Sequence, residues 1–447
     1  MKYKHKRVLV CGMGKSGSAA ARLLLRHGAQ VTLQDLKEEP VVERDLLENN
    51  NISTYFGRNP DEIVKDFDII VISPGISADL PFVHLAKSTG VNVIGEIELA
   101  SSVCTAPILA ITGTNGKTTT TTILGEIMKR FVPASQVAGN IGIAFCGVAD
   151  SISDNAYIVA EISSFQLETI KSFRPKISAV LNMTPDHLNR HKTMEGYVAA
   201  KERIFENQKA DDFCILNYDN EYTFKMADKT KAKVIFFSRK VLDEGVFVKD
   251  NFVWVKLGKY NESVIALDEL PIPGSHNLEN VLAAVAMAVC AGVPIDIIAH
   301  SVKDFKSVEH RMEFVREFNG ITFYNDSKAT NVDSAIMGLN AVNRPVILIG
   351  GGQDKGLDYG EWIAGFEGKV KSFIIIGEAG DKLEETCRKY NFTAFKKVLT
   401  MKEAVNLAFA SAEEGDCILL SPACASFDMF DDYEQRGRVF KELVAEV

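Results

Sequence analysis

A glycine-rich loop that ends in lysine and threonine is the feature that most restricts how this chain of 447 residues can fold. The loop, Thr112-Gly-Thr-Asn-Gly-Lys-Thr118, joins the apolar run 107–111 to a threonine-rich helix start. Its backbone N–H groups can surround a polyphosphate, with Lys117 near the terminal phosphates and Thr118 available to Mg²⁺. Residue 111 is Ile where the full phosphate-loop pattern has Gly. The mechanism does not need that glycine, so we predict a nucleotide-binding loop between a buried strand and a helix.

A second glycine loop stands near the N-terminus. Gly12, Gly14 and Gly17 fit the G-x-G-x-x-G pattern, and Asp35 ends the next strand-like segment. The glycines let the backbone approach a ligand closely, and the helix start offers unpaired N–H groups to a phosphate. A tight turn that binds nothing is the alternative. The later turn Ser73-Pro-Gly75 is placed to line the same crevice.

The order of strand-like and helix-like segments predicts three α/β units. The first extends to about residue 100, and the second contains buried runs rich in Val and Ile, which are typical of parallel strands covered on both faces. Between about 213 and 268 the pattern changes to short β-like pieces, with a turn at Lys249-Asp-Asn251, which predict an antiparallel appendage. Four further strand-like runs between 321 and 420 indicate the third unit. We expect the domains to be 1–100, 101–307 and 308–447.

Composition and charge restrict the partners and the compartment. The chain has 50 basic and 59 acidic residues and a net charge of −9, which does not predict a nucleic-acid face. The apolar runs are far shorter than the roughly 18 residues that a membrane span needs. Eight cysteines are scattered without a Cys-x-x-Cys pair or metal spacing, as reduced thiols are. The basic N-terminus leads directly into a strand-like run, unlike a signal peptide, so we expect a cytoplasmic protein.

Two polar residues follow buried strands of the second unit. Glu161 comes directly after the run 157–160, and His187 follows the run 177–183 by a short loop. The carboxyl ends of parallel strands are where open α/β sheets bind ligands, so both residues are candidate ligands for Mg²⁺ or Mn²⁺ beside the phosphate loop. Taken singly, Glu161 can instead cap the following turn, and His187 can be an ordinary surface histidine.

Lys201 lies on the apolar stripe of a helical stretch around residues 197–207. The sequence alone favours a lysine that packs its methylenes and extends its ammonium to water. If the ammonium were held near Mg²⁺ instead, repulsion would favour the neutral amine. A neutral amine can add CO₂ and become a carbamate, which is an anionic metal ligand.

A set of motifs in a fixed order resembles the Mur ligases of peptidoglycan synthesis. In chain order these are the loop 112–118, Gly139-Asn140, Glu161-Ile-Ser-Ser-Phe-Gln166, Asp186-His187, Ala200-Lys201, His276-Asn277-x-x-Asn280 and Glu309-His310-Arg311. Two more, Asn325-Asp-Ser-Lys-Ala-Thr-Asn331 and Ser421-Pro-Ala-Cys-Ala-Ser426, resemble the family members that add D-glutamate. The resemblance covers nearly the whole chain.

The resemblance implies a three-domain ligase that uses ATP to add D-glutamate to UDP-N-acetylmuramoyl-L-alanine through an acyl phosphate. An N-terminal Rossmann-like domain would bind the UDP end, and a central P-loop ATPase-like parallel sheet would bind ATP. A C-terminal Rossmann-like domain would bind the amino acid. Two Mg²⁺ ions, with Mn²⁺ as an alternative, and a CO₂-derived carbamate on Lys201 would complete the site. We expect a monomer that binds neither nucleic acid nor a membrane.

The resemblance also implies roles for single residues. The nucleotide would be bound by Gly113, Thr114, Asn115, Gly116, Lys117, Thr118, Thr119, Asn277, Asn280, Arg311 and Asp326. The metal ligands would be Thr118, Glu161, His187 and Lys201, and the catalytic residues Lys117, His187 and Lys201. The UDP-sugar substrate would contact Lys15, Ser16, Asp35, Leu36, Ser73, Pro74, Gly75, Asn140 and Ser163. D-Glutamate would contact Lys328, Thr330, Lys355, Ser426, Phe427 and Tyr433, where Tyr433 replaces the expected Phe.

Several other functions compete with this one. A nicotinamide oxidoreductase would use the loop 12–17 but leaves the loop 113–118 unexplained. Folylpolyglutamate synthetases share the ATPase and C-terminal parts, but their phosphate loop lies near the N-terminus, whereas about 100 residues precede it here. Mur ligases that add diaminopimelate or lysine carry an Asp-Asn-Pro-Arg motif, which this sequence lacks. A nucleotide-binding module without enzymatic activity is the alternative from a different class.

Overall fold

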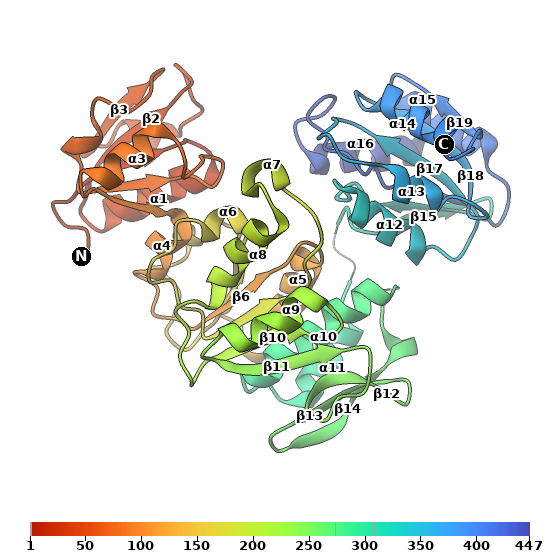
Figure 1. Ribbon diagram of the computed structural model, residues 1–447, viewed down its shortest axis with the longest axis horizontal. Coiled ribbons are helices and arrows are strands. Elements are labelled where there is room, and N and C mark those ends of the chain that lie inside the picture. The colour runs from red at the N-terminus through yellow and green to blue at the C-terminus, as the bar shows by residue number, and fades with distance from the viewer. Residues whose placement is uncertain (1, 273, 307–308) are drawn as a thin grey trace. The chain divides into compact units, whose positions relative to one another are not determined.

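The computed structural model describes residues 2–272, 274–306 and 309–447 and divides into two compact units (Figure 1). The first unit comprises Met1–Leu270 and Glu279–Phe305, and the second comprises Pro271–Leu278 and Lys306–Val447. The first unit holds two β-sheets and the second holds one. Among the described residues, no helix combines the length and the apolarity that crossing a membrane requires.

The N-terminal sheet has five parallel strands in the order β3-β2-β1-β4-β5. The strands are β1 Arg7–Cys11, β2 Gln30–Asp35, β3 Ile52–Phe56, β4 Ile69–Ile72 and β5 Asn92–Gly95. The helices are α1 Lys15–Arg26, α2 Arg44–Leu47, α3 Pro81–Ser88 and α4 Glu96–Ser101. Alternate residues of β1 and β4 belong to different buried apolar clusters, so the sheet is covered on both faces. Strand order reverses between β1 and β4, which creates a binding crevice beyond their carboxyl ends.

The central sheet has nine strands in the order β14-β13-β12-β11-β10-β9-β6-β8-β7. They are β6 Ile108–Thr112, β7 Gln136–Gly139, β8 Ile158–Glu161, β9 Ile177–Val180, β10 Phe213–Asn217, β11 Lys233–Ser238, β12 Gly245–Lys249, β13 Phe252–Leu257 and β14 Tyr260–Ala266. The helices of this part are α5 Lys117–Phe131, α6 Ser164–Leu167, α7 Leu188–His191, α8 Met194–Glu202, α9 Glu221–Lys225, α10 Ser275–Cys290 and α11 Ile295–Lys303. β6 lies between β8 and β9, so its following loop opens at the middle of the parallel sheet.

The antiparallel appendage is smaller than predicted. β10 and β11 pair in parallel with each other, and the antiparallel pairs are β12–β13 and β13–β14. The predicted turn between β12 and β13 is present at Asp250 and Asn251, whose φ angles of 49° and 64° suit a two-residue hairpin. β10 and β11 are joined through α9 rather than by a tight turn, and their short apolar runs resemble those of a meander.

The C-terminal sheet has six strands in the order β15-β16-β20-β17-β18-β19. They are β15 Glu313–Phe318, β16 Ile321–Asn325, β17 Val346–Gly351, β18 Val370–Ile376, β19 Phe395–Lys397 and β20 Cys417–Leu420. Only the β15–β16 pair is antiparallel. The helices are α12 Val332–Ala341, α13 Gly360–Ala364, α14 Gly380–Lys389, α15 Met401–Ser411 and α16 Tyr433–Glu446. Two apolar clusters pack on the sheet, so the predicted α/β class, with mainly parallel strands, is confirmed.

Candidate active site

The phosphate loop lies between β6 and α5, where the sequence predicts it. Gly116 has a φ of +81°, and a Cβ at this position would lie 2.1 Å from Oδ1 of Asn280, so only glycine fits. The backbone N–H of Asn115 donates to Oδ1 of Asn182 at 2.8 Å, which fixes the loop against the segment after β9. The loop is therefore shaped by its neighbours and brings Asn280, a predicted nucleotide contact, against its glycine turn.

Two lysines converge on the phosphate loop. Nζ of Lys117 donates to the carbonyl oxygens of Gly113 at 2.9 Å and Thr114 at 2.7 Å. Nζ of Lys201 donates to the same Gly113 oxygen at 2.8 Å and to Oγ1 of Thr112 at 3.2 Å. Lys201 is only 2% exposed. The solvent-reaching lysine that the sequence alone favours is therefore wrong, because the ammonium ends inside the site.

The environment of Lys201 favours its neutral form. Burial is the main cause that lowers the pKa of Lys201 well below its ordinary value, and the nearby Lys117 acts in the same direction. Asp186 and Glu161 oppose this shift but are weaker than burial. An uncharged amine is nucleophilic, so this lysine has the chemistry that addition to CO₂ requires.

Glu161 ends β8 and is 1% exposed. Its Oε1 accepts a 2.7 Å hydrogen bond from Nδ2 of Asn140, while the Asn140 N–H donates to the Glu161 carbonyl oxygen at 2.8 Å. Within the described residues, Oε2 of Glu161 has no hydrogen-bond partner. Leaving a buried carboxylate oxygen unpaired is costly, and a divalent cation would satisfy it. The chemistry of this oxygen therefore fits a metal ligand.

The helix after Glu161 has its own cap. Oγ of Ser163 accepts from the N–H of Gln166 at 3.3 Å, and the Ser163 N–H donates to Oε1 of Gln166 at 2.9 Å. This reciprocal arrangement is a capping box, and it explains the Ser-x-x-Gln part of the motif. Glu161 is thus not the residue that caps α6. The hydroxyl of Ser163 stands at the start of that helix, two residues after the buried carboxylate.

His187 occupies the N-cap position of α7 with a φ of +53°. Its side chain is 41% exposed and its Nε2 lies 3.6 Å from Oδ2 of Asp186. The ring packs edge-on against Phe165, with centroids 4.9 Å apart, and near Tyr197 at 6.4 Å. His187 therefore lies at the surface, and its contacts with Phe165 and Tyr197 fix the orientation of its ring.

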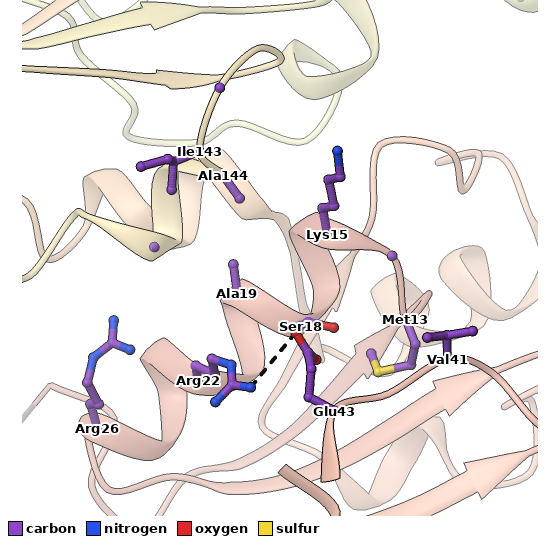
Figure 2. A pocket seen from close by; sticks show the side chains of 13 residues that line it. Met13, Lys15, Ser18, Ala19, Arg22, Arg26, Val41, Glu43, Ile143 and Ala144 are labelled. Carbon is purple, nitrogen blue, oxygen red and sulfur yellow. Dashed lines mark ion pairs between the residues drawn. The ribbon is translucent and has the colours of Figure 1, made fainter. Parts of the chain in front are cut away.

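A pocket of about 610 Å³ lies between α1 and the loop after β7 (Figure 2). Lys15, Ala19 and Arg22 line it from one face of α1, opposite Ile143 and Ala144. Lys15 is a predicted contact of the UDP-sugar substrate. Lys15, at the start of α1, thus lines the same pocket as residues 142–144, which follow Asn140.

Two other predicted uridine-side residues, Asp35 and Ser73, contact the glycine loop. Asp35 accepts backbone N–H groups from Met13 at 2.8 Å and Lys37 at 3.0 Å, and Oγ of Ser73 donates to the Gly12 carbonyl oxygen at 2.9 Å. A Cβ on Gly17 would lie 1.9 Å from the same Gly12 oxygen. The motif is therefore explained in part by packing. Ser16 follows Lys15 in α1, and Leu36 is 66% exposed at the end of β2.

In the second unit, four predicted contacts of D-glutamate lie together. Nζ of Lys328 donates to the Tyr433 hydroxyl at 3.2 Å and lies 5.0 Å from the centre of that ring. Nζ of Lys355 approaches the carbonyl oxygen of Thr330 at 3.5 Å. The remaining two residues differ sharply: Ser426 is 1% exposed and Phe427 is 67% exposed. Within the described residues, Oγ of Ser426 has no hydrogen-bond partner.

Arg436, which the sequence analysis missed, joins the loops that carry these residues. Its guanidinium is 1% exposed and donates to the carbonyl oxygens of Ser327 at 2.7 Å and of Cys424 and Ala425 at 3.1 Å each. Burial lowers its pKa to about 10. One available signal was its spacing of four residues from the buried Phe440 in α16, the same kind of placement that singled out Lys201.

Two predicted nucleotide contacts of the second unit, Asn277 and Asp326, are also buried. Burial raises the pKa of Asp326 to about 6, although Arg311 opposes the shift. Its carboxylate accepts from Oγ of Ser421 at 2.8 Å and from the N–H of Met312 at 3.3 Å. Asn277 in α10 is 4% exposed. These contacts fix Asp326 and leave its role toward a nucleotide as a prediction.

The Glu309-His310-Arg311 motif contains an acidic cluster that resembles a metal site. Glu309, His310 and Glu313 have ligand atoms within 4.8 Å of one another. Lys441, however, donates to Glu309 at 2.5 Å and to Glu313 at 2.9 Å, and Nδ1 of His310 lies 2.8 Å from Nδ2 of Asn325. The cluster is thus an ion-pair network that joins α16 to the start of the C-terminal sheet.

Three regions of the chain match domains of the Mur ligases. Residues 6–95 match the MurD-like N-terminal domain, residues 111–288 the middle domain and residues 310–424 the glutamate ligase domain. The chain is 47% identical to the UDP-N-acetylmuramoylalanine–D-glutamate ligase of Thermoanaerobacter sp. (strain X514), with all of both chains covered. It is 46% identical to the enzyme of that name from Alkaliphilus oremlandii (strain OhILAs), covering 100% of this chain and 99% of the relative.

Solved structures show the same fold at lower sequence identity. UDP-N-acetylmuramate-alanine ligase from Thermotoga maritima superposes with a TM-score of 0.62 at 18% identity, covering 99% of this chain and 100% of that one. A pseudomurein peptide ligase from Methanothermus fervidus gives a TM-score of 0.60 at 18% identity, with the same coverage. These solved structures support the fold alone. The two relatives above are more similar in sequence, at 46–47% identity over the full length.

Proposed function

The chain belongs to the Mur ligase family, and on this basis we propose that it uses ATP to add D-glutamate to UDP-N-acetylmuramoyl-L-alanine. The observation that carries this proposal is 45–47% identity, over the full length, to relatives that bear the name of that reaction. The product would be a precursor of peptidoglycan. The glycine loop with Lys117 supplies the part of the site that a nucleotide triphosphate requires.

We propose that the reaction proceeds through an acyl phosphate. A carboxylate is a poor acyl donor, so an oxygen of the alanyl carboxylate attacks the γ-phosphorus of ATP, and the bond to ADP breaks. The amine of D-glutamate then attacks the acyl carbon, the tetrahedral intermediate expels phosphate, and the nitrogen loses a proton. Holding the amine and the acyl group in place can supply up to about 7–11 kcal/mol of the barrier. The chain therefore acts mainly by positioning and by offsetting charge.

The central residues fit this chemistry. Lys117 lies against the loop that would hold the triphosphate, and α5 begins there with its unpaired N–H groups. Residues that would hold divalent cations are Thr118, Glu161, His187 and Lys201, and the unpaired buried oxygen of Glu161 supports this assignment. Bound Mg²⁺ or Mn²⁺ would offset the repulsion between the phosphate and the carboxylate.

Lys201 would serve as a carbamate. Burial lowers its pKa and so favours the unprotonated Nζ, which can form an N–C bond to CO₂ and release one proton. The product is an anion beside the phosphate loop, in place of a cation that Lys117 would repel. The burial of Lys201 and the positive charge of the nearby Lys117 together support the carbamate.

The substrate ends would be bound in different parts of the chain. We assign Asn140, Ser163 and the residues around Lys15 and Ser73 to the UDP-sugar, and Lys328, Thr330, Lys355, Ser426, Phe427 and Tyr433 to D-glutamate. Asn277, Asn280, Arg311 and Asp326 would contact the nucleotide. The two lysines and the buried Arg436 give the second unit a local positive charge for two carboxylates, although the whole chain is acidic.

Other features of the chain fit the same proposal. All eight cysteines are free thiols, which supports a reducing, cytoplasmic compartment. The Asp35 carboxylate, which a nicotinamide site would offer to a ribose, accepts two backbone N–H groups instead. We also propose the domain limits 1–100, 101–307 and 308–447, and a monomeric enzyme.

An amino-acid panel tests the proposed function. Purified protein is incubated with ATP, UDP-N-acetylmuramoyl-L-alanine and one radiolabelled amino acid at a time, and the labelled UDP-sugar product is separated. We expect incorporation of D-glutamate, no incorporation of diaminopimelate, lysine or L-glutamate, and none with the Lys117→Ala variant. Preferred incorporation of another amino acid, or normal D-glutamate incorporation by the variant, would contradict the proposal.

A further inference from the structure

Arg190 joins three segments of the first unit. Its guanidinium makes two hydrogen bonds to the carboxylate of Glu168, at 3.0 and 2.6 Å. It also donates to the carbonyl oxygens of Pro74 and Ile76, at 3.2 Å each. Its Cζ lies 4.3 Å from the centre of the Phe165 ring, and the side chain is 17% exposed. One side chain therefore holds a turn of the N-terminal sheet against helices of the central sheet.

Each of these segments carries a predicted site residue. The turn after β4 contains Ser73, Pro74 and Gly75, which are assigned to the uridine side. Glu168 is the C-cap of α6, whose N-cap is Ser163. Arg190 itself belongs to α7, whose N-cap is His187, and α7 lies beside α8 (Figure 1). The guanidinium therefore joins three segments: the turn that is assigned to the uridine end, the helix that begins at the proposed muramoyl contact Ser163, and the helix that begins at the proposed metal ligand His187.

We propose that Arg190 is a positioning residue that couples binding of the uridylyl group to the placement of α6 and α7. The inference rests on the proposed function, because it needs a substrate whose two ends lie in these two regions. Contacts with a remote, unreacting group can be used to place the reacting end. A planar guanidinium suits this role, because one edge satisfies a carboxylate with two parallel bonds while further N–H groups reach carbonyl oxygens.

Arg203 provides a matched control. It donates to the carbonyl oxygens of Leu167 and Ile170 at 2.7 Å each, and it forms an ion pair with Glu206. The number and kind of its bonds resemble those of Arg190, and it contacts the same α6 segment. All of its partners belong to the central part of the chain, whereas two partners of Arg190 belong to the N-terminal sheet. If Arg190 served only to hold α6, substitution of Arg190 and substitution of Arg203 should therefore have equal effects.

The test compares the full substrate with 1-phospho-N-acetylmuramoyl-L-alanine, which lacks the uridylyl group. For the unmodified protein, Arg190→Lys and Arg203→Lys, kcat/KM is measured on both substrates with ATP and D-glutamate. We expect Arg190→Lys to lower the ratio of kcat/KM for full over truncated substrate about tenfold, with KM changing more than kcat. Arg203→Lys should leave this ratio within about twofold of the unmodified value.

Several outcomes decide the matter. Equal losses on both substrates in Arg190→Lys, or the same change of ratio in Arg203→Lys, would overturn the coupling. If Arg190→Lys fails to fold, Glu168→Gln, which removes the charge that holds the guanidinium, replaces it and must lower the ratio in the same direction. Absence of turnover by the unmodified protein would refute the proposed function instead, so the two failures are distinguishable.

Discussion

The two units of the molecule each bury a cation, and they bury different ones. Lys201 in the first unit is 2% exposed and Arg436 in the second is 1% exposed. Both donate to backbone carbonyl and hydroxyl oxygens, those of Gly113 and Thr112 for the lysine and those of Ser327, Cys424 and Ala425 for the arginine. Both cations are thus held by oxygen acceptors, but a second cation, Lys117, acts on Lys201, whereas the carboxylates Asp326 and Asp428 act on Arg436.

Burial lowers the pKa of both groups, with unequal consequences. Lys201 falls well below its ordinary value, so its amine can be neutral, whereas Arg436 falls only to about 10 and stays charged at neutral pH. A lysine can therefore become a nucleophile, while an arginine remains a fixed charge that holds loops together. Under the proposed function, the first unit would use its buried cation for chemistry, whereas the second uses its buried cation to hold loops in position.

The largest effect that tests this difference is expected at Lys201. Lys201→Ala and Lys201→Arg should both lower kcat by about a thousandfold or more, because neither side chain can form a carbamate. Short carboxylates such as acetate should partly restore Lys201→Ala and leave Lys201→Arg inactive. Steady-state kinetics with and without acetate measure this. If Lys201→Arg keeps most of the activity, the lysine serves as a charge and the comparison fails.

Arg436 should show the opposite pattern. Arg436→Met removes a guanidinium that satisfies three carbonyl oxygens, so the free energy of unfolding should fall by about 3 kcal/mol. KM for D-glutamate should rise because the loops with Lys328 and Ser426 lose their shared contact. Denaturant unfolding followed by kinetics measures both. An unchanged free energy of unfolding would mean that the Arg436 guanidinium does not hold these loops.

Glu96 extends the comparison to a buried acid. Its Oε1 accepts from the N–H of Cys146 at 2.6 Å, and burial raises its pKa from 4.5 to about 7. The folded state then binds the proton more tightly than the unfolded state, so this stabilisation is complete below pH 4.5 and is lost as pH rises through 7. Between pH 5 and 7 the loss should be about 2 kcal/mol. Glu96→Gln should remove this part of the pH dependence, as measured by unfolding at several pH values; an identical pH profile in the variant would contradict it.

The smallest effect is expected at Tyr433. Tyr433→Phe removes only the hydroxyl that accepts from Lys328 at 3.2 Å and keeps the ring under the ammonium. We expect KM for D-glutamate to change by about threefold or less. A loss of activity as large as that of Lys201→Ala would show that the hydroxyl takes part in chemistry, and that position is not the only task of the second unit.

Local patterns were predictable from the sequence, and long-range partners were not. The loop 113–118 directly follows an apolar run and precedes a helix start, so its place between a strand and a helix was predicted correctly, whereas its contact with Asn182 was not. The burial of Lys201 depends on contacts about ninety residues away, at Thr112 and Gly113, which periodicity cannot show. Arg436 and Arg190 were missed for the same reason, because some of their partners lie more than a hundred residues away, at Ser327 for Arg436 and at Pro74 and Ile76 for Arg190.

Strand pairing followed the same rule. The Asp250-Asn251 turn gave a correct hairpin, because a two-residue loop is a local signal. The parallel pairing of β10 and β11 was not recognised, since their partners are chosen by the sheet as a whole. β15 lies at the edge of its sheet and was also not predicted, because its sequence Glu-Phe-Val-Arg-Glu-Phe does not alternate polar and apolar residues.

The most direct test of the central claim follows an oxygen atom. The substrate is prepared with ¹⁸O in the alanyl carboxylate and is converted with ATP and D-glutamate, and the released phosphate is analysed by mass spectrometry. Ligation through an acyl phosphate at the Lys117 loop predicts that each phosphate carries one ¹⁸O from the substrate. Phosphate without ¹⁸O, in a reaction that still forms the D-glutamyl product, would contradict the account.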